Sequence, residues 1–190
     1  VNMQYSTYNR SILPQLSSNG LHIITQHEKL TKKQEEYLNR YFEDEVYPVL
    51  TPMAVDSSRP FPLIRNKSLN IGALVRKKGE EKAEIEFATV QVPSVLPRII
   101  QLPQEIGEKS AVILLEEVIE HNIDQLFLNY DVICAHPFRI MRNADLSIDE
   151  DEAADLLKEI EKQLKKRQWG EAIRLEVEDG IDKRLLKIIT

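Results

Sequence analysis

Arginine and asparagine side chains near residue 140 are the strongest candidates for binding phosphate. Arg139, Arg142 and Asn143 lie close together in the sequence. Guanidinium groups match the geometry of phosphate oxygens, and an asparagine amide adds further donors. Arg139 and Arg142 are three residues apart, so in a regular strand they would point to opposite faces and would not form one clamp. Because structural ion pairs are common, the favoured interpretation is that Arg142 and Asn143 fix a strand-to-helix turn, while Asp145 pairs with an arginine.

The other residue types that often carry chemistry do not form a recognisable site. None of the four histidines has a second histidine or cysteine at metal-ligand spacing. The six glycines do not have the spacing of a phosphate-binding loop. The acidic run Asp149–Glu152 opens a predicted helix, where capping and the helix dipole explain it without a metal. We therefore expect no catalytic residue and no metal site in this chain.

Hydrophobic periodicity predicts the elements that must position the arginines. The first twenty residues are expected to be helical up to Gly20, although Pro14 argues against one uninterrupted helix. Thr31 and Gln34 have the form of a capping box that starts a helix ending near Pro48. Further strands are expected at 21–25, 68–76, 83–92, 98–102, 111–115, 131–142 with an interruption at Pro137, and 172–178, and further helices at 116–127, 147–168 and 181–189.

These elements predict an α+β fold, in which a mixed or antiparallel sheet is packed with helices and preceded by a helical segment. Strands 68–76 and 83–92 are expected to form a hairpin. We predict a domain division into residues 1–50 and 51–190.

Composition narrows the class of protein. The chain has 31 acidic and 25 basic residues and a net charge of −6, which disfavours nucleic acid as a partner. It has no apolar run of membrane-spanning length, and its first residues do not form a secretory signal. The single cysteine, Cys134, lies in an apolar run and is expected to be a buried structural thiol. These features predict a cytoplasmic protein.

Three motifs, in order along the chain, resemble the polyphosphate kinase family whose members autophosphorylate on histidine. The first is Pro48-Val-Leu-Thr-Pro-Met-Ala-Val-Asp56, followed by Pro60-Phe-Pro and Ser68-Leu-Asn. The second is Phe138-Arg-Ile-Met-Arg-Asn-Ala-Asp-Leu146 with Asp149-Glu, and the third is Ala172-Ile-Arg-Leu-Glu-Val-Glu178. Ser57-Ser-Arg59 departs from the proline and histidine expected in many relatives. The resemblance places the chain at the end of that family's N-terminal helical region and in its head, or middle, domain.

The resemblance implies that the parent enzyme moves the γ-phosphate of ATP to a histidine and then, reversibly and with Mg²⁺, to polyphosphate. It also implies that the catalytic histidine and the basic tunnel lie in C-terminal domains that are missing from this chain. We expect these residues to scaffold the channel and the ATP entrance, to help form a homodimer, and to be inactive and free of ATP and Mg²⁺ on their own. The alternative is a free-standing dimerisation or partner-binding module without ligand contacts.

A second cationic group flanks the first motif. Arg59, Arg65 and Lys67 lie beside a loop in which prolines alternate with apolar residues, so the loop is expected to be docked and rigid. In the family context these cations could face the polyphosphate channel or the ATP entrance. They could equally be rim charges at a domain or dimer interface.

Overall fold

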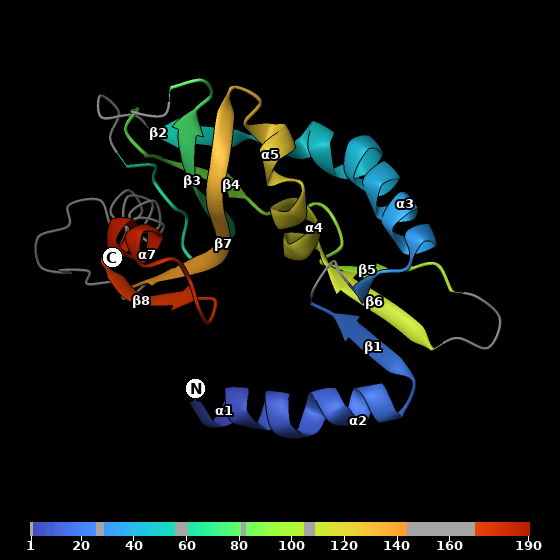
Figure 1. The fold of residues 1–190 in the computed structure, drawn as a ribbon. Coiled ribbons are helices and arrows are strands. Elements are labelled where there is room, and N and C mark those ends of the chain that lie inside the picture. Colours follow the sequence, from blue (N-terminus) through green and yellow to red (C-terminus); the bar gives the residue numbers. More distant parts are fainter. Residues whose placement is uncertain (1, 26–28, 56–60, 81–82, 105–108, 144–169) are drawn as a thin grey trace, which may run out of the picture. The chain divides into compact units, whose positions relative to one another are not determined.

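A computed structural model describes the chain except for residues 1, 26–28, 56–60, 81–82, 105–108 and 144–169 (Figure 1). It divides into two compact units, each built from separate stretches of sequence. Unit 1 comprises residues 1–50 and 92–126, and unit 2 comprises residues 51–91 and 127–190. The domain division at residue 50 stays a prediction. The predicted helix at 147–168, with its acidic run, lies outside the described residues.

Unit 1 begins with a chain of helical segments, namely α1 (Asn2–Thr7), the π-helical turn η1 (Tyr8–Ile12) and α2 (Leu13–Ser18). The helix type changes just before Pro14, which lies in the first turn of α2. Proline is tolerated there because its missing N–H would have no partner inside the helix. Gly20, with φ +89°, ends the helical segments as predicted.

The predicted capping box is present at the start of α3 (Lys32–Tyr41). The Thr31 hydroxyl accepts from the Gln34 amide at 3.4 Å, and the Gln34 side chain accepts from the Thr31 amide at 3.0 Å. Helical turns continue through η3 (Phe42–Val46) and η4 (Tyr47–Val49). Phe42 and Val46, four residues apart on one face of these turns, are fully buried.

The sheet of unit 1 has the strand order β1-β6-β5, with β1 (Leu21–Ile24), β6 (Ser110–Leu114) and β5 (Ile99–Gln101). β1 runs parallel to β6, and β5 runs antiparallel to it. The single helix predicted at 116–127 is instead two helices, α4 (Leu115–His121) and α5 (Ile123–Leu126). The break is at Asn122, whose side-chain amide donates back to the Val118 carbonyl at 2.9 Å and competes with the next helical turn.

Unit 2 contains a five-stranded sheet in the order β2-β4-β3-β7-β8, in which each neighbouring pair is antiparallel (Figure 1). The strands are β2 (Pro52–Val55), β3 (Leu69–Lys77), β4 (Glu86–Gln91), β7 (Tyr130–Arg142) and β8 (Ala172–Val177). The predicted hairpin is therefore confirmed as β3 and β4, and the predicted α+β fold is observed.

The predicted interruption at Pro137 is wrong, because β7 continues through it as one strand. Pro137 is paired with Ile71 of β3, whereas pairing with β8 begins only at Phe138. A proline is tolerated within a strand where its nitrogen needs no ladder hydrogen bond. The β8 side of Pro137 offers such a position, since the β7–β8 ladder stops one residue away.

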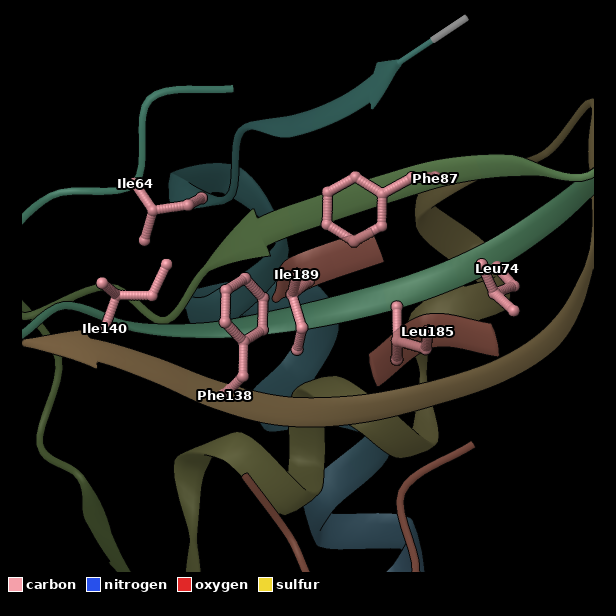
Figure 2. Packing of buried hydrophobic residues seen from close by; sticks show 7 residues of the cluster. All are labelled: Ile64, Leu74, Phe87, Phe138, Ile140, Leu185 and Ile189. Atoms are coloured by element: carbon pink, nitrogen blue, oxygen red, sulfur yellow. The ribbon is translucent and has the colours of Figure 1, made fainter. Parts of the chain in front are cut away.

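The core of unit 2 forms where α7 (Lys183–Ile189) packs on the sheet. Figure 2 shows the buried cluster, in which Leu185 and Ile189 of α7 meet side chains from the strands and from the loop before β3. The cluster consists of Ile64, Leu74, Phe87, Phe138, Ile140, Leu185 and Ile189. Gly72 lies beneath the rings, since a Cβ there would meet Phe138 at 3.1 Å and Phe87 at 3.3 Å. Among the described helices, none is long and apolar enough to cross a membrane.

Candidate phosphate-binding site

The pairing of β7 with β8 brings two arginines and one glutamate together on a sheet face. Arg139 is opposite Glu176, and Met141 is opposite Arg174. Opposed residues and residues two apart share a face, so Arg139, Arg174 and Glu176 point the same way. Arg174 Nη2 lies 2.8 Å from Glu176 Oε1, whereas Arg139 Nη1 lies 3.7 Å from Glu176 Oε2. Among the described residues, these two guanidinium groups share one carboxylate.

Arg139 is the less satisfied of the two arginines. Its Nε atom is buried and has no hydrogen-bond partner among the described residues, and its contact with Glu176 is too long for a hydrogen bond. Buried donors are usually paired, so an unpaired one in a structure calls for a physical explanation. The Arg139 side chain is 32% exposed, so solvent or an oxyanion can reach the guanidinium. An oxyanion at the exposed part of this guanidinium would balance its positive charge.

Arg142 has a different set of partners, as its spacing from Arg139 predicted. Its Nε donates to the Ile64 carbonyl at 3.1 Å, and its Nη1 donates to the Gly170 carbonyl at 3.0 Å. The Arg142 amide also donates to Asn66 Oδ1 at 2.9 Å. The guanidinium therefore ties the end of β7 to the loop before β3 and to the segment that enters β8. These contacts support the structural interpretation of Arg142 over direct phosphate contact.

Asn143 takes part in the same junction through its backbone. Its amide donates to the Glu171 carbonyl at 2.8 Å, next to a shift in the β7–β8 register between Met141 and Arg142. Gly170 must be glycine here, because an added Cβ would come within 2.1 Å of the Asn143 carbonyl oxygen. The Asn143 side chain is exposed. The proposed arginine partner of Asp145 cannot be traced, since Asp145 lies outside the described residues.

Arg65 and Lys67 lie in the turn that leads into β3. The Arg65 carbonyl accepts from the amide and the hydroxyl of Ser68, while its side chain is exposed. Lys67 has φ +61°, and its amide donates to the Ile140 carbonyl at 2.8 Å. This turn is therefore held against the end of β7, next to the Arg142 junction. Arg59 lies outside the described residues.

Sequence reasoning missed Arg174 and Glu176 as site residues. The Arg-x-Glu spacing in an alternating strand could have shown that the two share a face. It could not show that Arg139, far away in the sequence, lies opposite them. Cys134 is predicted to be buried but is only half-buried, packed against the core cluster of unit 2. Burial raises the pKa of its thiol.

Comparisons with known proteins give the family. A family model described as the polyphosphate kinase middle domain matches residues 33–190. The chain belongs to the polyphosphate kinase family. It is 49% identical over 190 residues to a polyphosphate kinase of Halalkalibacterium halodurans and 48% identical over 190 residues to one of Bacillus anthracis. The matches cover 100% and 98% of this chain but only 26% and 27% of those relatives, so the chain spans about a quarter of their length.

The fold of this chain is also similar to that of a solved structure. The crystal structure of polyphosphate kinase from Porphyromonas gingivalis matches with a TM-score of 0.67 at 24% identity, over 86% of this chain and 27% of that one. At this identity the comparison supports the fold alone. The family resemblance predicted from the three sequence motifs is thereby confirmed by the family model and by the relatives.

Proposed function

We propose that the intact protein is an ATP:polyphosphate phosphotransferase and that this chain is a non-catalytic part of it. The intact enzyme would transfer the γ-phosphate of ATP to a histidine and then, reversibly, to polyphosphate. The observation that carries the proposal is the match to the polyphosphate kinase middle domain over residues 33–190. ATP and Mg²⁺ would supply the phosphoryl group and neutralise its charge when bound. A cytoplasmic location is part of the same proposal.

The role proposed for these residues is to position phosphate and to scaffold the channel and the ATP entrance. Support comes from the arginine pair on β7 and β8, because phosphoryl transfer depends on positioning and on charge neutralisation. The contact that Arg139 makes with Glu176 is 3.7 Å long, so a phosphate oxygen could replace that contact at little cost. Arg174 would stay anchored to Glu176 and keep the second guanidinium in place. Arg142 would act indirectly, by holding the end of β7.

The first test compares the purified 190-residue chain with the full-length enzyme. Each is incubated with ATP and Mg²⁺, and the formation of polyphosphate is measured. The expected result is synthesis by the full-length enzyme alone, because this chain carries no phosphate-binding glycine loop in its sequence. Polyphosphate made by the purified 190-residue chain would overturn its assignment as a non-catalytic part.

The second test replaces Arg139 by Gln in the full-length enzyme. Loss of one charge-assisted contact should raise the KM for ATP or for polyphosphate about tenfold, equivalent to roughly 1.4 kcal/mol. Arg184→Gln is the matched control, because Arg184 is also in unit 2 but pairs with Asp182 on α7. If Arg139→Gln is folded and has the same kinetics as the unmodified enzyme, Arg139 does not contact ATP or polyphosphate.

A second candidate function is that of a dimerisation or partner-binding module. The observation that favours it is the exposed apolar face on α1 and η1, where Tyr5 is 53%, Tyr8 39% and Ile12 44% exposed at the spacing of one helix face. Exposed apolar patches on soluble proteins commonly mark interfaces. Light scattering of the chain and of its Tyr5→Lys, Ile12→Lys variant would detect a dimer that uses this surface. A dimer with unchanged kinetics in Arg139→Gln would favour this function over a contact role.

A further inference from the structure

The contact between β3 and β7 continues beyond the regular ladder through one side chain. β3 begins at Leu69, whose partner on β7 is Arg139. Residues 140–142 of β7 lie past this point, and β3 supplies no ladder partner for them. There the Arg142 amide donates to Asn66 Oδ1 at 2.9 Å. A longer β3 in the same register would place Asn66 opposite Arg142, so the Asn66 side chain supplies a hydrogen bond in place of strand backbone.

The backbone turn at Lys67 holds Asn66 beside β7. Among the described residues, Lys67 is the only non-glycine residue with a positive φ, at +61°. Such a conformation is uncommon for lysine and persists where neighbouring contacts hold it. The Lys67 amide donates to the Ile140 carbonyl at 2.8 Å. The amide and the hydroxyl of Ser68 close the turn by donating to the Arg65 carbonyl at 3.2 and 2.9 Å.

The loop before this turn is anchored in the core of unit 2. Ile64 is 2% exposed and belongs with Ile140 of β7 to the buried cluster (Figure 2). Its carbonyl accepts from Arg142 Nε at 3.1 Å. Asn66 itself is half-buried, so water competes less for its hydrogen bond than it would at an exposed site. The turn is therefore a fixed support for the end of β7.

On its other side, β7 is paired less regularly at the same residues. The β7–β8 register shifts between Met141 and Arg142, whereas Arg139 lies in the regular part opposite Glu176. A register shift disrupts the ladder locally. The hydrogen bonds from Asn66 and Lys67 therefore help to fix the path of the strand just after Arg139. The bond from Asn66 comes from a side chain, so a substitution can remove it.

We propose that Asn66 is a positioning residue for Arg139, because its side chain fixes the end of β7 and so sets where the Arg139 guanidinium lies. The proposal rests on the proposed contact between Arg139 and a phosphate oxygen, and Asn66 itself needs no contact with the ligand. The distance of 3.7 Å from Arg139 Nη1 to Glu176 Oε2 is too long for a hydrogen bond that would hold the guanidinium. Its placement then depends on the strand that carries it, and a displacement of about 1 Å can remove much of the effect of an orienting group.

The test is a double-mutant cycle in the full-length enzyme, measured on the KM that Arg139→Gln raises. Asn66→Ala removes the acceptor and should raise this KM about threefold, with kcat within about twofold of the unmodified enzyme. Asn66→Asp keeps an acceptor oxygen and should return the KM to within about twofold of the unmodified value. In the Arg139→Gln background, Asn66→Ala should have no further effect on this KM, because no guanidinium is left to position.

Thr89→Val is the matched control. Thr89 Oγ1 donates to the Ile71 carbonyl at 2.9 Å, so this variant also loses one hydrogen bond from a side chain to the backbone of the same sheet, but away from β7. It should lower stability without changing the KM. Hydrogen exchange of the amides at residues 139–142 in the full-length enzyme should be faster in Asn66→Ala and unchanged in Asn66→Asp and Thr89→Val.

If Asn66→Ala does not fold, Ser68→Ala takes its place, since loss of the Ser68 hydroxyl loosens the same turn and leaves Asn66 present. The proposal is overturned if exchange at residues 139–142 is unchanged, or if exchange is faster while the KM stays that of the unmodified enzyme. It is also overturned if Asn66→Ala raises the KM equally with and without Arg139. An unchanged KM in Arg139→Gln alone instead overturns the phosphate contact of Arg139, and the positioning role of Asn66 with it.

Discussion

At the scale of single residues, the partner of each guanidinium decides its role. The Arg142 guanidinium donates hydrogen bonds to the backbone carbonyls of Ile64 and Gly170, which are neutral acceptors. Arg139 has a 3.7 Å carboxylate contact and a buried Nε that has no partner in the described part of the chain. The first arrangement fixes a junction of the fold, and the second leaves capacity to bind an anion. Residue type alone could not distinguish the two.

Arg98 and Glu116 form a bidentate pair in unit 1 whose two members differ in burial. The Glu116 side chain is 6% exposed, and that of Arg98 is 54% exposed. Arg98→Ala would leave a buried carboxylate without its partner and should lower the free energy of unfolding by about 2–3 kcal/mol. Glu116→Gln leaves a guanidinium that water can solvate, so this variant should lower the free energy of unfolding by only about 1 kcal/mol.

Urea unfolding of the two single variants measures this asymmetry directly. The double variant Arg98→Ala, Glu116→Gln should recover part of the loss, because no charge then stays buried and unpaired. A larger loss for Glu116→Gln than for Arg98→Ala would show that the buried carboxylate is not the costly member of the pair.

Asp182 should make stability depend on pH in the acidic range. Hydrogen bonds from the Arg184 side chain and amide lower the pKa of the Asp182 carboxyl from its ordinary value near 3.8. The folded chain therefore binds this proton at a lower pH than the unfolded chain does. The stabilisation is complete above the ordinary pKa and is lost as the pH falls from about 4 toward the lowered pKa.

Asp182→Asn isolates this contribution, because asparagine can still cap α7 but cannot ionise. The difference in urea midpoint between the unmodified chain and this variant should be largest at about pH 6 and should shrink at about pH 2.5. The other carboxylates titrate in both proteins, so their contributions cancel in the midpoint difference. A midpoint difference that is the same at both pH values would contradict the assignment.

At the scale of elements, regular patterns were predictable and pairing partners were not. Alternation of apolar residues predicted β3 and β4, and the Thr31 capping box predicted the start of α3. The sequence predicts a strand break at Pro137, because it does not show that the β8 ladder stops beside this residue. It also predicts that Asn122 is helical, because the hydrogen bond from its side chain to the Val118 carbonyl depends on the local turn.

The candidate site shows the same limit. Arg139 could be chosen from its type and from its place in a strand, but Glu176 and Arg174 become its neighbours only through the pairing of β7 with β8. That pairing joins segments that are far apart in the sequence, and no local pattern encodes its register. The sequence alone therefore identifies Arg139, whereas Arg174 and Glu176 are found only from the strand pairing.

Gly170 is the tightest point of the junction between β7 and β8. Gly170→Ala would place a Cβ at 2.1 Å from the Asn143 carbonyl oxygen, and both backbones would have to move. We expect a loss of about 2 kcal/mol or more in the free energy of unfolding, with the β7–β8 end opened. Gly79→Ala is the matched control, because Gly79 has φ +78° and open space around it, and this replacement should cost about 1 kcal/mol.

Thermal and urea unfolding rank the two glycine variants, and amide exchange at Met141 and Arg142 locates the effect. Faster exchange in Gly170→Ala than in Gly79→Ala is expected at these amides. Equal stability of the two variants would show that the approach of Gly170 to Asn143 is not needed for the fold.

At the scale of the whole molecule, each unit is assembled from two separate stretches of the chain. Residues 92–126 belong with 1–50, and residues 127–190 belong with 51–91. The predicted division at residue 50 is into two consecutive blocks, because composition shifts and proline-rich loops indicate local boundaries only. Interleaving of this kind depends on long-range contacts between core residues, which leave no local signal in a single sequence.

The overall charge leads to a prediction about polymers. With 31 acidic and 25 basic residues, the chain should not retain single-stranded DNA at about 150 mM salt, because such binding needs clustered cations that release counterions. The exposed arginines and lysines described above form small groups, each suited to a few phosphates. Fluorescence anisotropy of a labelled oligonucleotide is the measurement, and tripolyphosphate is the comparison ligand. Binding to DNA that survives this salt would reveal a continuous basic face, and the net acidic charge would then fail to predict the partners of this chain.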